Sequence, residues 1–182
     1  VSLDGSGEVT LNRNLPEYIK IVKKYGAKAF MFSNGMRMRG DFMKETIDAG
    51  CDFFRFSIIG YNATKYQEWM NSKAFQIVLN NLKDMQDYVN GSDSECVVAT
   101  YHLITDNNDI DNEVTQYRKI VDWAGVKTEI WKMHNWSGVY DVPYERQGKV
   151  KTCGRPFSPD VVIRAGGIDG AGGAIHPCCQ VL

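Results

Sequence analysis

The feature that most constrains the fold is a regular alternation of short apolar runs with amphipathic runs. Runs of strand length, rich in aromatic and β-branched residues, follow a short N-terminal strand at 1–3 and occupy 28–32, 53–59, 96–104 and 126–133. Apolar residues at helical spacing predict intervening helices over 15–26, 41–49, 73–89 and 111–124. Asn14 is expected to cap the first of these helices. This β–α order with short connections predicts a parallel sheet with covering helices, either a barrel or a doubly wound sheet.

The alternation stops near Val142, where prolines and glycines become frequent. We therefore expect an α/β domain over 1–141 and a loop-rich, cysteine-containing extension over 142–182. The chain starts without Met and stops at Leu182 without a polar tail, so we expect a fragment cut at both ends.

Charge and hydropathy exclude several classes of protein. The chain has 21 Lys and Arg against 22 Asp and Glu, a net charge of −1, which argues against a nucleic-acid arm or a polybasic membrane patch. No apolar run approaches the roughly 18 residues that span a bilayer, and no signal peptide is recognisable. We expect a cytoplasmic protein without nucleic-acid or membrane partners.

The 5 cysteines divide into two groups. Cys51 and Cys96 border apolar runs and are predicted to be small buried residues. Cys153, Cys178 and Cys179 lie in a Gly- and Pro-rich region, where a thiolate metal site in a reducing compartment suits them better than a disulfide.

Polar residues follow every predicted strand, in the segments 4–8, 33–35, 57–62, 105–108 and 134–138. Because the carboxyl ends of parallel strands converge on one face, a binding site is expected there. The same residue types are also ordinary turn formers. Around Gly7, backbone N–H groups could bind a carboxylate or phosphate, and Glu8 could bind an ammonium group or simply begin the next turn.

These segments resemble the radical S-adenosylmethionine (SAM) enzymes. Gly7–Leu15 is similar to that family's second strand end, where Gly-Gly-Glu precedes Pro and Leu; here Ser6 replaces the first Gly and Val9 the Pro. Segment 33–35 resembles the Thr-Asn-Gly that follows the third strand, and segment 55–60 resembles the Ser-containing fourth strand. The order and spacing match over nearly the whole chain.

The resemblance implies a partial (β/α)6 TIM-like barrel that binds SAM. Segment 6–8 would bind the amino group of the methionine part, and Asn34 would line the site. Ser57 and Arg55 would contact the ribose or carboxylate, although Arg55 could instead be a surface cation of a strand. Asn107 would flank the adenosine or the substrate. The implied cofactor-binding residues are Ser6, Gly7, Glu8, Ser33, Asn34, Arg55, Ser57 and Asn107.

One motif of the family is missing. The Cys-x-x-x-Cys-x-x-Cys that holds the reducing [4Fe–4S] cluster normally precedes the strand that opens this chain. We expect the first β–α unit, with that motif, to lie outside the fragment. A degenerate member without redox chemistry is the other explanation.

The cysteines of the extension resemble the start of a SPASM extension, which holds an auxiliary iron–sulfur cluster. Gly173 and Cys178 have 4 residues between them, as in that pattern, whereas an insertion over 165–172 must be assumed after Cys153. The resemblance implies an auxiliary [4Fe–4S] cluster at Cys153, Cys178 and Cys179. A structural zinc site and unligated thiols are the alternatives.

Two histidines have different expected roles. His134 follows the last predicted strand and is a candidate proton donor on the substrate side, or a hydrogen-bonded structural residue. His102 lies inside a strand and is expected to be structural.

The resemblance implies an enzyme that forms a 5′-deoxyadenosyl radical from SAM and abstracts hydrogen from a peptide, sugar or other small molecule. An electron donor such as a flavodoxin or ferredoxin would be its partner, and the fragment alone is expected to be inactive. The alternatives are a different β/α-barrel enzyme that binds a phosphorylated ligand, and a zinc-stabilised binding module without catalysis.

Overall fold

The computed structural model describes residues 1–5, 7–106, 108–133, 161–165 and 173–176. The chain divides into two compact units, 1–133 and 134–182.

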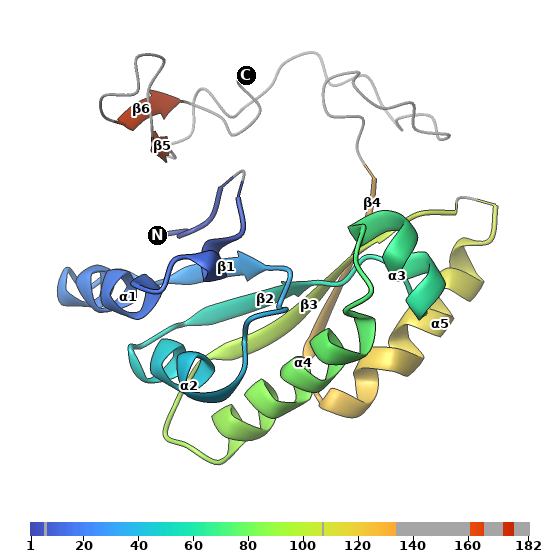
Figure 1. Cartoon of the computed structure of the whole chain (residues 1–182), viewed down its shortest axis with the longest axis horizontal. Helices are drawn as coiled ribbons and strands as arrows, with labels where there is room; N and C mark the ends of the chain where they lie inside the picture. The colour runs from blue at the N-terminus through green and yellow to red at the C-terminus, as the bar shows by residue number, and fades with distance from the viewer. Residues whose placement is uncertain (6, 107, 134–160, 166–172, 177–182) are drawn as a thin grey trace. The chain divides into compact units, whose positions relative to one another are not determined.

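The first unit is built on a parallel sheet of four strands in sequential order, β1–β2–β3–β4 (Figure 1). The strands are β1 (Phe30–Ser33), β2 (Phe53–Ser57), β3 (Val97–Ile104) and β4 (Lys127–Lys132). Ser2 forms an isolated parallel bridge with Phe30, so the N-terminal segment lies beside β1. A doubly wound sheet reverses its strand order at a switch point, and this sheet has no reversal. Within the described residues the sheet is open, so the barrel stays a prediction.

Five α-helices and two short 3-10 helices accompany these strands in the described part of the first unit. They are η1 (Val9–Leu11), α1 (Leu15–Lys24), α2 (Gly40–Asp48), α3 (Ala63–Met70), α4 (Phe75–Asn90), α5 (Ile110–Val121) and η2 (Asp122–Ala124). Helices α2, α4 and α5 lie along the same side of the sheet (Figure 1). One-sided cover is what right-handed crossovers between consecutive parallel neighbours produce.

Alternate strand residues face the helices and form the core. Met31, Phe54, Phe56 and Val98 are buried there against apolar helix residues such as Ile19. The residues between them in each strand point to the opposite side of the sheet because the side-chain period of a strand is two. Most of these are half-buried or exposed, although Ala99 is buried; the half-buried or exposed ones include Phe30, Phe32, Phe53, Arg55, Ser57, Tyr101, Glu129 and Trp131. Within the first unit this second face of the sheet is therefore open.

Most predicted elements are confirmed within one or two residues. One expectation about a helix was wrong, and one helix was not predicted. Asn14 makes no side-chain capping hydrogen bond, because its backbone (φ −85°, ψ 7°) is not in the extended conformation that capping needs. Helix α3 was not predicted: only Tyr66 in it is buried, so it lacks an apolar stripe. Its signal was Asn62, whose side chain accepts a hydrogen bond from the amide of Lys65 and caps the helix.

In the second unit, β5 (Val162–Ala165) and β6 (Gly173–His176) pair antiparallel. A search of the described helices found none with the length and apolar character needed to cross a membrane.

Candidate functional site

Glu8 connects the first two loops at the carboxyl ends of the strands. Its Oε1 accepts hydrogen bonds from the hydroxyls of Thr10 and Ser33, both at 2.6 Å. Its Oε2 accepts one from the backbone amide of Asn34 at 2.7 Å. The carboxylate therefore holds the loop after the N-terminal segment against the loop after β1. The structure brings together Glu8, Ser33 and Asn34, three of the residues predicted to form one site.

The loop after β1 is fixed from the helix side as well. Gly35 has φ +74°, and a Cβ atom there would lie 2.2 Å from the ring of Phe56. The side-chain amide of Asn81, in α4, donates to the carbonyl oxygen of Gly35 at 2.8 Å. Only glycine fits this approach, so Asn34 is presented by a loop whose backbone position is set by packing.

Tyr66 of α3 is a site residue that the sequence did not indicate. Its side chain is fully buried, and its hydroxyl has no hydrogen-bond partner among the described residues. Burial raises the pKa of Tyr66 to about 12, and the negative charge of Glu8 adds to the shift. Tyr66 is therefore a protonated donor in the neighbourhood of Glu8.

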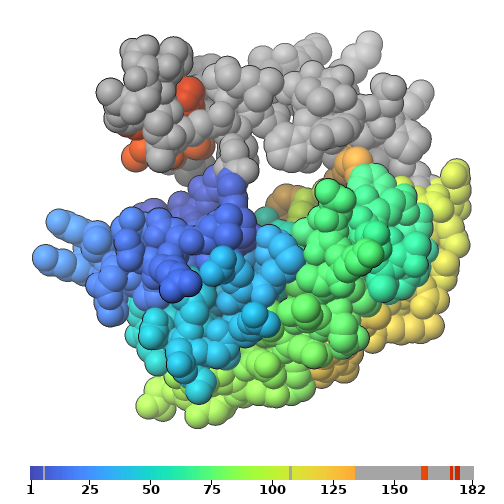
Figure 2. Space-filling view, in the orientation of Figure 1, coloured from blue at the N-terminus to red at the C-terminus, as the bar shows by residue number. Residues whose placement is uncertain are grey.

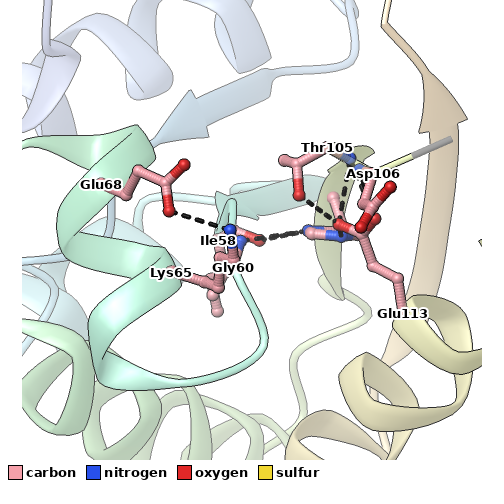
Figure 3. A network of polar contacts seen from close by, with 8 residues as sticks. Ile58, Gly60, Lys65, Glu68, Thr105, Asp106 and Glu113 are labelled. Carbon is pink, nitrogen blue, oxygen red and sulfur yellow. Dashed lines mark hydrogen bonds and ion pairs between the residues drawn. The ribbon is translucent and has the colours of Figure 1, made fainter. Parts of the chain in front are cut away.

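A second network joins the loops after β2 and β3 (Figure 3). Nε2 of His102 lies 2.9 Å from Oε1 of Glu113, and Nδ1 of His102 accepts from the amide of Gly60 at 3.2 Å. Glu113 also accepts from the hydroxyl of Thr105 at 2.6 Å and the amide of Asp106 at 2.8 Å. His102 is structural, as predicted, whereas the role of Glu113 required the folded arrangement to be seen.

The pKa shifts define the charge state of this pair. Burial alone would raise the pKa of Glu113, but hydrogen bonds from Thr105, Asp106 and His102 outweigh it and lower that pKa. Burial lowers the pKa of His102 in spite of the neighbouring Glu113. An anionic Glu113 beside a neutral His102 accounts for two of the contacts: Nε2–H donates to the carboxylate, and Nδ1 accepts from Gly60. The carbonyl oxygen of Ile58 also lies 3.2 Å from Nδ1 and receives no hydrogen bond in this tautomer.

We expect stability to fall in two steps as the solution is acidified. Both pKa values are depressed in the folded state, so the unfolded chain binds protons first on acidification. The free energy of unfolding should decrease below about pH 6.5, from His102, and again below about pH 4.5, from Glu113. Urea titrations across this range measure both steps.

His102→Gln should remove the upper step and leave the lower one. A free energy of unfolding that stays constant or rises between pH 7 and pH 5 would contradict this assignment of charges.

Arg55 lies on the open face of the sheet, inside a cluster of aromatic rings. Its guanidinium carbon is 3.9 Å from the ring centre of Phe32, 4.5 Å from that of Tyr101 and 5.4 Å from that of Trp131. Its Nη1 pairs with Oε2 of Glu129 at 3.1 Å, and its buried Nε has no partner among the described residues. Arg55 is thus a half-satisfied cation in an aromatic surrounding, and its predicted contact with a cofactor stays a prediction.

The other predicted site residues fall into two groups. Ser57, at the end of β2, is half-buried, and its hydroxyl makes no hydrogen bond within the described residues; Gly7 is exposed. The predicted residues that lie outside the described residues are Ser6, Asn107, His134, Cys153, Cys178 and Cys179.

Cys51 and Cys96 are buried free thiols with their sulfur atoms 3.6 Å apart, which confirms the packing interpretation. A search of the described residues finds no group of three His, Cys, Asp or Glu side chains that could hold a metal ion.

No family model matches the chain, and no curated protein matches it either. A solved structure, Streptococcus suis SuiB bound to the precursor peptide SuiA, is similar with a TM-score of 0.50 at 8% sequence identity. The match covers 68% of this chain and 26% of the SuiB chain, so this chain spans about a quarter of the SuiB length. At that identity the likeness shows a shared α/β fold.

Proposed function

We propose that this chain forms the SAM-binding part of a radical SAM enzyme that modifies a peptide. The observation that carries the proposal is the sequential parallel sheet whose first two strand-end loops are joined by Glu8 to Ser33 and Asn34. SuiB, a structural neighbour, was solved with a precursor peptide bound. Of the substrate classes that the sequence left open, this likeness favours a peptide.

The residues at these loops fit the groups of SAM. Oε2 of Glu8 receives only the Asn34 amide among the described residues, so it retains capacity for an ammonium group. A Cβ atom built at Gly7 would meet nothing within 4 Å, which leaves room for a ligand at its backbone. The free hydroxyl of Ser57 can bond a ribose hydroxyl. On accepting one electron, bound SAM would give methionine and a 5′-deoxyadenosyl radical, and the side chains named above would bind and orient the SAM.

The described residues contain no group of three side chains that could hold an iron–sulfur cluster. We propose Cys153, Cys178 and Cys179 as ligands of an auxiliary [4Fe–4S] cluster, with zinc as the other metal that thiolates favour. An electron donor such as a ferredoxin and the proton-donor role of His134 belong to the same proposal.

The test is anaerobic iron–sulfur reconstitution of the full-length protein, followed by measurement of SAM affinity and of 5′-deoxyadenosine by mass spectrometry. We expect a brown protein that binds SAM and releases 5′-deoxyadenosine. Ser57→Ala should weaken SAM binding by about threefold to tenfold through one lost hydrogen bond. Because the Ser57 hydroxyl makes no hydrogen bond to the residues that the structure describes, the melting temperature should stay the same.

Glu8→Gln should weaken SAM binding by about tenfold or more, because a charge-assisted contact to the ammonium group is lost. Glu17→Gln, at an exposed position of α1, is the matched control and should bind SAM normally. If Glu8→Gln lowers the melting temperature but leaves SAM affinity unchanged, Glu8 only holds the loops. A colourless protein with stoichiometric zinc and no 5′-deoxyadenosine would overturn the proposed function.

A further inference from the structure

A surface cleft of about 650 Å³ lies beside the strand-end loops of the first unit. The residues that line it are Thr10, Arg13, Arg37, Arg39, Phe42 and Glu45. They come from the segment after the N-terminal strand, the loop after β1, and helix α2, which adjoin one another in Figure 2. Volumes between about 300 and 1,000 Å³ are typical of ligand sites, so the cleft has room for a ligand of several residues.

The charge of the cleft is unbalanced. Arg13, Arg37 and Arg39 are exposed, and none of them forms an ion pair within the part of the chain that the structure describes. Only one carboxylate, that of Glu45, lines the cleft with them. Guanidinium groups bind carboxylates through two parallel hydrogen bonds, so this cluster is suited to an anionic ligand.

The local fold holds two of these arginines in place. Met38, between Arg37 and Arg39, is fully buried in the core. The amide of Arg39 donates to the carbonyl oxygen of Arg37 at 2.9 Å, and that of Met38 donates to the carbonyl oxygen of Gly35 at 3.2 Å. A buried residue therefore anchors the loop while both neighbours remain at the surface.

The cleft is also connected to the candidate site. Thr10 lines it, and the hydroxyl of Thr10 donates to Oε1 of Glu8. Arg37 and Arg39 follow the Ser33–Gly35 loop whose amide at Asn34 binds the same carboxylate. A ligand held in the cleft would therefore lie next to the loops that are proposed to bind SAM.

We propose that this cleft binds an acidic segment of the peptide substrate, with the three arginines paired to separate carboxylates. The inference rests on the proposed function for its choice of a peptide. The carboxylate of Glu45, which lines the same cleft, would repel the concentrated negative charge of a phosphate group more than the single charges of separate carboxylates. Phe42 adds an apolar wall for a side chain between the charges.

The experiment is fluorescence anisotropy with a short labelled peptide in which glutamates alternate with leucine and alanine. It is run on the full chain without SAM or cluster. Arg13, Arg37 and Arg39 are replaced by glutamine singly and together, with Arg118→Gln, at an exposed position of α5, as the matched control. We expect Kd to rise about threefold for each single change and at least about tenfold for the triple change, and to rise with salt. The control should bind as the unchanged chain does.

Several outcomes would overturn the inference. The first is that a peptide with glutamine in place of glutamate binds equally well. The second is that the triple variant has an unchanged Kd as well as an unchanged melting curve. The third is that low-millimolar inorganic phosphate displaces the peptide. The two proposals can fail separately. If the peptide binds but no 5′-deoxyadenosine is released, the cleft proposal stands and the radical chemistry is rejected. If 5′-deoxyadenosine is released but the peptide does not bind, the radical chemistry stands and the cleft proposal is rejected.

Discussion

Replacing Glu113 with alanine should lower the free energy of unfolding by about 3 to 5 kcal/mol, the cost of breaking a buried charged network. Glu113 is 2% exposed, and its carboxylate accepts hydrogen bonds from Thr105, Asp106 and His102. Alanine would leave the buried His102 and the half-buried Thr105 without this partner, and losing the partner of a buried donor costs more than a typical hydrogen bond stabilises. Because Thr105 and Asp106 form the loop after β3, the same change should weaken SAM binding.

Urea unfolding monitored by circular dichroism measures this loss. Asp111→Ala, at an exposed position in the first turn of the same helix, is the control and should cost less than about 1 kcal/mol. An equal, small effect of both changes would show that the carboxylate of Glu113 does not hold the loop.

Gly60→Ala should be nearly as damaging, with an expected loss of about 3 to 4 kcal/mol. Gly60 has φ +116°, and a Cβ atom there would lie 2.4 Å from the amide nitrogen of Tyr66 and 2.6 Å from the carbonyl carbon of Lys65. Both are backbone atoms of α3, so a rotamer change cannot relieve the clash. The change would separate α3 from the loop after β2 and disturb the bond from the Gly60 amide to His102.

Gly125→Ala separates the conformational cost from the steric one. Gly125 has φ +68° with nothing within 4 Å of a Cβ atom, so alanine there should cost only about 1 to 2 kcal/mol. Thermal and urea unfolding of both variants test the comparison. A loss at Gly60 no larger than that at Gly125 would mean that α3 can shift to accept the methyl group.

Much of the fold could be predicted because its signals are local. The period of Val78, Leu82 and Met85 matches the helical repeat, and all three residues are buried in α4. The α3 helix was not predicted because it buries only Tyr66 and depends on a cap and on tertiary packing. Prediction of Asn14 as a cap failed for a related reason: the residue type was right, but its backbone conformation was set by its neighbours.

The candidate site was predicted in outline, since the carboxyl ends of parallel strands must meet. The partners of its residues were not predicted. Glu113 is 11 positions from His102, and Glu129 is 74 positions from Arg55. No spacing rule in a single sequence connects positions that meet only when a helix packs on a sheet or when β4 is added beside β3.

The sequence by itself determined the order of strands and helices, the loops in which a site could form, and the group of residue types available there. These follow from periodicity and turn chemistry, which act over a few residues. Only the tertiary structure decided that Glu8 joins two loops, that Glu113 is buried with His102, and that three arginines share one cleft without an ion-pair partner in the described part of the chain. Those outcomes depend on packing and on the removal of water around charged groups, and both are properties of the assembled chain.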